Sequence, residues 1–237
     1  MIDALVLFCG GPAIYEGLPK PLQTLRTGGT LIEHYLKHIR PTAPKQIFLL
    51  VEKSFEKHYL KIINQVDYPA EISLLSCKDN SSTFFKLKNF LGANFSPKWY
   101  VMLSYPDIFT FEKLAIPEPE DSQLEDKVFI SYVPIFSRFP RLVVDQYLGT
   151  VRGISNHVSA MPSNPLHIYG GHLVAHLDLL TNIVNEFSLD CSIDDPNLEF
   201  DLFYWLVNKK RLVSFQIYGQ WVQADSPREI EGLIESP

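Results

Sequence analysis

The first half of the chain alternates between short apolar runs and segments whose apolar residues recur at helical spacing. The run at 4–8 ends at Gly10 and Gly11, and after a loop the segment 31–39 shows helical spacing before another apolar run at 46–51. Short, continuously apolar runs are typical of strands that are covered on both faces. A strand, a helix and a second strand in this order predict a βαβ unit with a right-handed crossover.

The same alternation continues along the chain and predicts an α/β fold. Further strands are expected at 72–75, 99–103, 128–133, 141–144, 166–175 and 214–218, and further helices at 55–63, 83–91, 177–187 and 200–208. This order favours a Rossmann-like three-layer sandwich around a mostly parallel mixed sheet. With 237 residues, 46% of them hydrophobic, the chain is expected to form a single domain over residues 1–237. The segments 117–126 and 159–165 are interpreted as loops within it.

Charge and cysteine content narrow the class of protein. The net charge of −6 and the lack of a basic run disfavour a nucleic-acid partner. The three cysteines are odd in number and widely spaced, which predicts free thiols and a reducing compartment. Asp3 interrupts the first apolar stretch, and glycines end it too early for a signal peptide or a membrane span. We therefore expect a cytoplasmic protein without a membrane partner.

Two predicted strands end in residues suited to phosphate and metal chemistry. Lys20 follows the Gly10-Gly11 loop between two prolines, and Asp107 follows the strand at 99–103. In an open parallel sheet, ligands bind beyond the carboxyl ends of the strands. Lys20 is placed to reach a phosphate and Asp107 to bind Mg²⁺, although an ordinary loop lysine and a turn aspartate are the alternatives. Asp225 has a similar alternative, because Asp-Ser-Pro also starts helices.

Four segments, in order, resemble the sugar-phosphate nucleotidyltransferases. The Gly-Gly loop is followed by Pro-Lys-Pro-Leu at 19–22 and by Gly-Thr-Leu-Ile-Glu-His at 29–34, which is similar to the opening of that family. Tyr-Pro-Asp at 105–107 falls where these enzymes carry Gly-Asp, and Ile-Tyr-Gly-Gly-His-Leu-Val at 168–174 is similar to their sugar-contacting segment. The segment 218–227 is similar to the end of the glucose-1-phosphate cytidylyltransferase branch.

The resemblance implies a fold of the nucleotide-diphospho-sugar transferase type and a Mg²⁺-dependent reaction. A nucleoside monophosphate would pass from a nucleoside triphosphate to a sugar 1-phosphate, or to a related phosphorylated small molecule, with release of pyrophosphate. Such a protein would serve nucleotide-sugar and polysaccharide biosynthesis. The residues that the resemblance implies are Lys20, Asp107 and Asp225 for catalysis, with Asp107 and Asp225 as metal ligands; Cys9, Gly10, Gly11, Lys20, Ser82 and Thr83 for the nucleotide; and Gly170, Gly171 and His157 for the sugar.

Three positions depart from the family pattern. Tyr15 replaces the loop arginine, Asn156-His157 replaces a Glu-Lys-Pro sequence, and Pro106 replaces a glycine. Losing one preorganised electrostatic partner commonly costs about 10²–10³ in rate. A non-catalytic nucleotide- or sugar-binding regulatory protein is therefore one alternative, and a glycosyltransferase, which would need an Asp-x-Asp after an apolar strand, is another. The cations considered as replacements are Arg26, Arg138, Arg152 and His157.

Two acidic residues begin the last predicted helix. Glu199 and Asp201 are interpreted as its acidic first turn, because a carboxylate near a helix N-terminus is favourable with the helix dipole. A supporting role near the substrate is the alternative for both residues. The aromatic residues between 84 and 100 are interpreted as packing residues rather than as a base-stacking surface.

Overall fold

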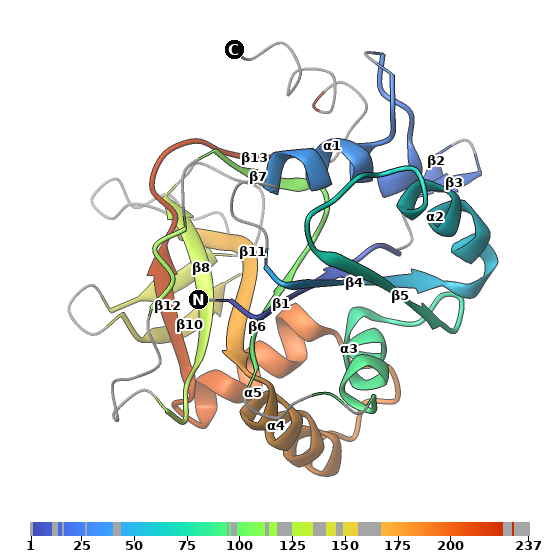
Figure 1. Ribbon diagram of the computed structural model, residues 1–237. Coiled ribbons are helices and arrows are strands. Elements are labelled where there is room, and N and C mark those ends of the chain that lie inside the picture. Colours follow the sequence, from blue (N-terminus) through green and yellow to red (C-terminus); the bar gives the residue numbers. More distant parts are fainter. Residues whose placement is uncertain are drawn as a thin grey trace.

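The computed structural model describes residues 2–10, 14–15, 17–26, 28–39, 44–93, 95, 99–111, 114–117, 125–134, 141–145, 149–155, 167–224 and 229. A central mixed sheet lies between two layers of helices (Figure 1). This arrangement confirms the predicted α/β three-layer fold. No helix among the described residues has the length and apolar character needed to cross a membrane.

Nine strands of the described chain form the sheet. They are β1 (Ala4–Phe8), β4 (Gln46–Glu52), β5 (Glu71–Cys77), β6 (Tyr100–Ser104), β8 (Val128–Pro134), β9 (Arg141–Val144), β10 (Val151–Ser155), β11 (His167–His176) and β12 (Leu212–Gln216). The main path runs β10-β9-β11-β6-β1-β4-β5, and β8 lies between β11 and β12. Strands β6, β1, β4 and β5 are parallel, whereas β11 runs antiparallel to β6, β8 and β9.

The helices cover the two faces of the sheet. They are α1 (Leu31–Ile39), α2 (Glu56–Ile63), α3 (Thr83–Leu91), α4 (Leu177–Asp190) and α5 (Phe203–Asn208). Figure 1 shows α1 and α2 on one side and α3, α4 and α5 on the other. Alternate residues of a strand face opposite sides of a sheet. Accordingly, Leu5 and Leu7 of β1 pack with α1 and α2, whereas Val6 and Phe8 pack with α3 to α5.

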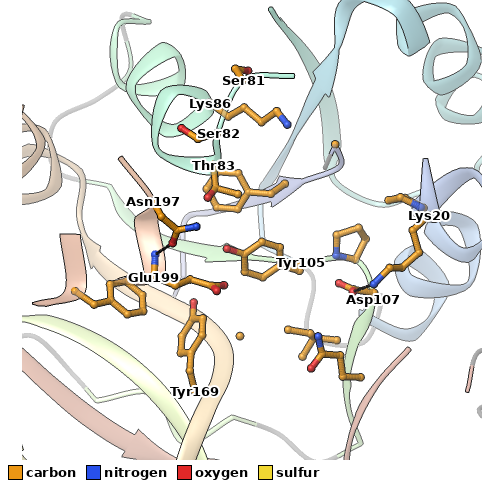
Figure 2. A pocket seen from close by; sticks show the side chains of 18 of the residues that line it. Lys20, Ser81, Ser82, Thr83, Lys86, Tyr105, Asp107, Tyr169, Asn197 and Glu199 are labelled. Atoms are coloured by element: carbon orange, nitrogen blue, oxygen red, sulfur yellow. Dashed lines mark hydrogen bonds and ion pairs between the residues drawn. The ribbon is translucent and has the colours of Figure 1, made fainter. Parts of the chain in front are cut away.

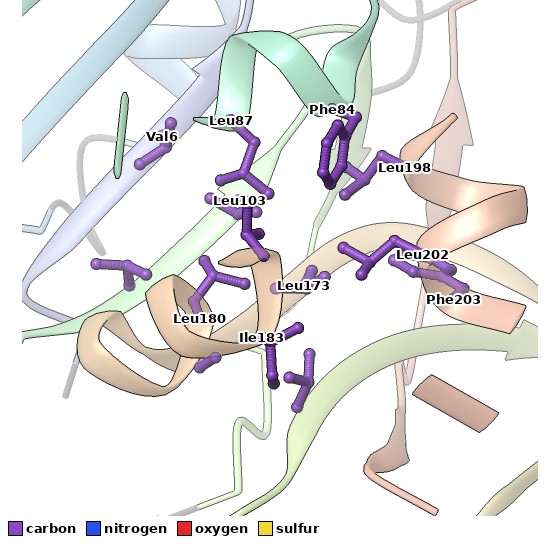
Figure 3. Packing of buried hydrophobic residues seen from close by; sticks show 14 of the residues in the cluster. Val6, Phe84, Leu87, Leu103, Leu173, Leu180, Ile183, Leu198, Leu202 and Phe203 are labelled. Atoms are coloured by element: carbon purple, nitrogen blue, oxygen red, sulfur yellow. The ribbon is translucent and has the colours of Figure 1, made fainter. Parts of the chain in front are cut away.

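The core beneath α3 to α5 also fixes the turn that precedes α5. This turn, η4 (Leu198–Leu202), is π-helical, and the sequence had predicted an ordinary helix from residue 200. Figure 3 shows Leu198 of η4 near Phe84 of α3 and Leu202 beside Phe203. Leu198 and Leu202 are almost completely buried, and burying a leucine side chain contributes about 1.5–3 kcal/mol. The turn between them is therefore held firmly against the sheet.

Several short elements were not predicted from the sequence. They are β2 (Ile14–Tyr15), β3 (Leu18–Pro19), β7 (Ile108–Thr110), β10 and β13 (Trp221–Gln223). Strands β2 and β3 form a small hairpin, and β7 pairs with β13 in antiparallel fashion. The three cysteines are free thiols, as predicted. Most of the two predicted loops, at 117–126 and 159–165, lies outside the described residues.

Candidate functional site

A cavity of about 420 Å³ opens beyond the carboxyl ends of β1 and β6. Its walls come from the ends of these strands, the start of α3, the middle of β11, and η4 with the residues beside it (Figure 2). Small-molecule sites commonly have volumes of about 300–1,000 Å³. The position is also the one where open parallel sheets bind ligands. The cavity is therefore the candidate functional site.

The structure brings two of the predicted catalytic residues together. Lys20 lies on the short helical turn η1 (Lys20–Leu22), and its Nζ donates a hydrogen bond to Asp107 Oδ2 over 2.7 Å. Both side chains line the cavity and are only 13% and 14% exposed. Pro19 and Pro21 flank the lysine, and a proline ring restricts the backbone angle φ at its own position. The ion pair is therefore held at one end of the cavity by a stiff segment.

The third predicted catalytic residue, Asp225, lies outside the described residues. The chain directly before it is held beside Asp107, because the backbone N–H of Ala224 donates to the Asp107 carbonyl oxygen over 2.8 Å. Strand pairing continues this contact, since Gln223 of β13 lies opposite Ile108 of β7. The segment that ends at Ala224 thus meets the segment that carries Asp107 at this end of the cavity.

The carboxylate of Asp107 fits a phosphate-bound Mg²⁺. The described residues contain no group of three or more histidine, cysteine, aspartate or glutamate side chains able to hold a metal. Mg²⁺ usually takes one or two protein carboxylates together with substrate phosphates rather than a cage made of protein alone. The Asp107 carboxylate, which faces the cavity beside Lys20, matches that requirement.

The first turn of α3, with Ser82 and Thr83, forms another wall of the cavity. Ser82 is the N-cap residue, and its Oγ accepts a hydrogen bond from Phe85 N over 3.3 Å. Ser82 and Thr83 both line the cavity. A helix N-terminus offers unpaired backbone N–H groups and a partial positive charge, and both favour a phosphate.

A second lysine reaches the cavity, and sequence reasoning missed it. Lys86 of α3 is only 1% exposed, and its Nζ lies 3.2 Å from Glu52 Oε1 at the end of β4. A Cβ atom at Gly10 would lie 3.0 Å from this Nζ, so the ammonium group stands against the glycine loop. No sequence pattern marks Lys86, because its burial on α3 and its pairing with Glu52 arise only in the fold, where a buried lysine needs a partner.

Of the cations that the sequence suggested as replacements, the two described ones, Arg26 and Arg152, do not line this cavity. Arg152 pairs with Asp145 and is mostly exposed, and neither Arg152 nor Arg26 is among the residues that line the cavity. Arg138 and His157 lie outside the described residues. Among the described residues, the cavity-lining cations are Lys20 and Lys86.

The glycines of β11 meet tight packing constraints. Gly171 has a φ of +87°, and a Cβ there would stand 1.9 Å from Ile108 Cδ1. At Gly170 a Cβ would stand 2.6 Å from Ile217 Cδ1, and the Gly170 carbonyl oxygen accepts a hydrogen bond from Trp221 Nε1 over 2.9 Å. Both glycines are thus required for packing, and their predicted contact with a sugar stays a prediction.

The residue after Gly171, His172, is a buried histidine outside the cavity. His172 Nδ1 lies 2.9 Å from Ser104 Oγ, and burial lowers the pKa of His172 to about 4. The imidazole is therefore neutral near pH 7. It does not line the cavity, so we assign it to the packing of β11 against β6.

Glu199 and Asp201 both lie in the first turn of η4, as predicted, but their side chains have different surroundings. Asp201 does behave as a helix-start carboxylate, because its Oδ2 accepts a hydrogen bond from Asn197 N over 2.6 Å. The Glu199 side chain instead enters the cavity, where Figure 2 shows it pointing toward Tyr105 and Tyr169. Burial raises the pKa of Glu199, and a hydrogen bond with Tyr105 partly offsets this rise. The alternative, a place beside a substrate, is the one that the geometry supports.

The predicted site residues thus fall into three groups. The cavity brings together Gly10, Lys20, Ser82, Thr83, Asp107 and Gly171; Cys9 and Gly170 do not line it; and Gly11, His157 and Asp225 lie outside the described residues. Cys9 packs on the α1 and α2 side of the sheet, and its carbonyl oxygen accepts a hydrogen bond from the Tyr59 hydroxyl over 2.5 Å.

Comparison with known proteins places the fold. No family model and no curated protein sequence matches the chain. Among solved structures, HddC from Yersinia pseudotuberculosis is 15% identical and superposes with a TM-score of 0.71 over 96% of both chains. The same protein complexed with GMP-PN is 14% identical, with a TM-score of 0.68 over 98% of this chain and 97% of the other. The inositol-1-phosphate CTP transferase from T. maritima is 14% identical, with a TM-score of 0.74 over 99% and 97%. The chain therefore shares the fold of these proteins along nearly its whole length.

Proposed function

We propose that the protein is a Mg²⁺-dependent nucleotidyltransferase that joins a nucleoside monophosphate to a phosphorylated small molecule, such as a sugar 1-phosphate, and releases pyrophosphate. The observation that carries this proposal is the buried pair of Lys20 and Asp107, held 2.7 Å apart at the edge of the cavity. Further support comes from the sequence motifs around both residues and from the shared fold with a CTP transferase.

The reaction requires alignment and charge neutralisation more than covalent chemistry by the protein. An oxygen of the acceptor phosphate attacks the α-phosphorus of the nucleotide, and the bond from that phosphorus to the pyrophosphate oxygen breaks. Mg²⁺ held by Asp107, and by Asp225 according to the family resemblance, would neutralise charge on the phosphate oxygens. Lys20 and the N-terminal turn of α3 would hold the phosphates at opposite walls of the cavity.

The pairing of Lys20 with Asp107 also suits a change of partners on nucleotide binding. Without a ligand, each side chain neutralises the other in a mostly buried position. A buried charge without a partner is strongly unfavourable. When a Mg²⁺-nucleotide enters, the metal takes the carboxylate and a phosphate takes the ammonium group, so both charges stay paired.

The direct test of the function is a pyrophosphate-release assay with ATP, CTP, GTP and UTP, each combined with a panel of sugar phosphates and other phosphate esters in the presence of Mg²⁺. Release that needs both substrates supports a nucleotidyltransferase. A nucleotide that binds without release from any combination supports instead a regulatory binding protein. The replacement of the loop arginine by Tyr15 favours this second candidate function.

We further predict that Lys86 supplies the fixed cation that Tyr15 does not. The single change Lys86→Met would leave the Glu52 carboxylate buried without its partner, which commonly costs about 3–5 kcal/mol of stability. The informative protein is therefore the double variant Lys86→Met with Glu52→Gln. Replacing both members of a buried pair is often neutral for stability, but turnover should fall about 10²–10³-fold.

Steady-state pyrophosphate release and thermal unfolding of the same preparations measure these two effects. Lys88→Met is the matched control, because Lys88 lies on the same helix with an exposed side chain. We expect it to retain full turnover. A double variant that is folded and turns over at the wild-type rate would show that Lys86 only balances the charge of Glu52.

A further inference from the structure

One wall of the cavity carries a partly buried carboxylate, that of Glu199, which forms no ion pair with a cation among the described residues. The Glu199 carboxylate lines the cavity, and burial raises its pKa. Its hydrogen-bond partner there is the Tyr105 hydroxyl, which is neutral. None of the ion pairs found between described residues involves Glu199. A carboxylate taken out of water in this way is costly unless a ligand compensates its charge.

Aromatic rings surround this carboxylate. Tyr105, Tyr169 and Phe203 line the cavity with it. The Tyr169 and Phe203 rings pack edge to face with centroids 5.1 Å apart, and Tyr105 packs against Phe8 at 5.4 Å. The tyrosine hydroxyls are uncharged near pH 7. Aromatic faces attract a cation, and more strongly when water is excluded.

The charges along the cavity are separated. Figure 2 shows Lys20 beside Asp107 on one side of the cavity and Glu199 with Tyr169 on the other. Tyr105 lies between the two sides, and Ser82 and Thr83 of α3 lie on the same side as Glu199. The side with Lys20 suits phosphate groups and the surroundings of Glu199 suit a positive charge. A neutral polyol can donate hydrogen bonds to a carboxylate, but it leaves the buried charge uncompensated. An ammonium group provides the opposite charge. It also donates hydrogen bonds or, when it is quaternary, makes close contact with the carboxylate.

We propose that Glu199, Tyr105 and Tyr169 bind a positively charged amino or quaternary ammonium group, and that the acceptor is therefore a zwitterionic phosphate ester. This inference rests on the proposed nucleotidyltransferase function and names the class of its second substrate. Two sources carry this chemistry, amino-sugar phosphates and amino-alcohol phosphates, and the experiment distinguishes them.

The experiment compares esters that differ in charge but not in shape. Calorimetry on the unaltered protein with a non-hydrolysable triphosphate and Mg²⁺ measures affinity for phosphocholine against 3,3-dimethylbutyl phosphate, and for glucosamine 1-phosphate against glucose 1-phosphate. In at least one pair the ammonium compound should bind about tenfold tighter or more, and the pair that shows the preference identifies the source. Equal binding within both pairs, or tighter binding of the neutral members, would overturn the proposal.

The variant Glu199→Gln tests whether the preference comes from the carboxylate. Glutamine keeps the size of the side chain and an oxygen that accepts the Tyr105 hydrogen bond, so the preference for the ammonium compound should disappear while the fold remains. Asp194→Asn is the matched control, because Asp194 is exposed nearby in the sequence, and it should leave the preference unchanged. A preference that survives Glu199→Gln would assign it to another group.

Two further readouts separate this inference from the proposed function. Binding of the Mg²⁺-triphosphate alone depends on Lys20 and Asp107, so Glu199→Gln should leave it unchanged. If the unaltered protein does not bind a Mg²⁺-triphosphate in the absence of any ester, the proposed function is contradicted. In that case, the esters would be measured with the protein alone. Tighter binding of the ammonium esters would still support the site around Glu199, and equal binding of charged and neutral esters would contradict it.

Discussion

Replacing Asp107 with asparagine is expected to lower the rate of pyrophosphate release by about 10²–10³-fold or more. The change removes the charge that pairs with Lys20 at 2.7 Å and that we propose to hold Mg²⁺, while the size of the side chain stays the same. The rate at saturating nucleotide and acceptor measures the effect. Because Lys20 loses a mostly buried partner, thermal unfolding of the variant should be recorded in the same buffer.

The matched control for this variant is Asp126→Asn. Asp126 also pairs with a lysine, Lys127, at 2.6 Å, but its side chain is 59% exposed. An exposed ion pair contributes about 0–1 kcal/mol, so this control should keep both its stability and its turnover. Asp107→Asn with unchanged turnover would sink the assignment of Asp107 as a metal ligand and, with it, the proposed arrangement of the phosphates.

Replacing Gly171 with alanine is expected to destabilise the protein severely. The residue has a φ of +87°, and its new Cβ would stand 1.9 Å from Ile108 Cδ1. A side chain in a sparsely populated backbone conformation costs about 1–3 kcal/mol, and an overpacked core costs a further 1–3 kcal/mol or so. We expect a loss of about 2–6 kcal/mol in the free energy of unfolding, measured by urea denaturation.

Two companion variants separate these causes. Gly153→Ala in β10 introduces a Cβ with no atom within 4 Å, so its stability should change by no more than about 0.5 kcal/mol. Adding Ile108→Val to Gly171→Ala removes the atom that clashes, and it should recover the packing part of the loss but not the backbone part. A Gly171→Ala protein as stable as the wild type would show that β11 does not require glycine at this position.

The parts of the fold that the sequence predicted are those that bury a regular pattern. Strands β1, β4 and β6 are covered on both faces, so β1 is apolar throughout and β4 and β6 are apolar between their ends. Strands β7 and β13 span only three residues each, which is too short for a period to show. Their pairing depends on the segment after Asp107 meeting the segment before Asp225, a contact between distant parts of the chain. The extent of the chain as one domain stays a prediction.

The residues of the candidate site also divide into those that could be predicted from the sequence and those that could not. Lys20 and Asp107 were predictable because each follows a strand, and parallel strands end at one edge of a sheet. Glu199 was not, because a carboxylate near a helix start has a sufficient local reason to be there, and Asp201 fulfils that role in its place. Only the π-helical turn η4, fixed by the burial of Leu198 and Leu202, directs Glu199 into the cavity. The position of Lys86 could not be predicted either, because its partner Glu52 lies on a different element.

Nucleotide binding is the central claim, and a thermal-shift measurement with ATP, CTP, GTP and UTP, each with and without Mg²⁺, tests it most directly because no acceptor needs to be known. A triphosphate at about 100 times its dissociation constant adds roughly 2.7 kcal/mol of stability, which for a chain of this length raises the unfolding temperature by about 5–10 °C. We predict a shift of this size with at least one nucleotide, dependent on Mg²⁺ and abolished in Asp107→Asn. The absence of any shift with all four nucleotides would contradict the assignment of this cavity as a nucleotide site.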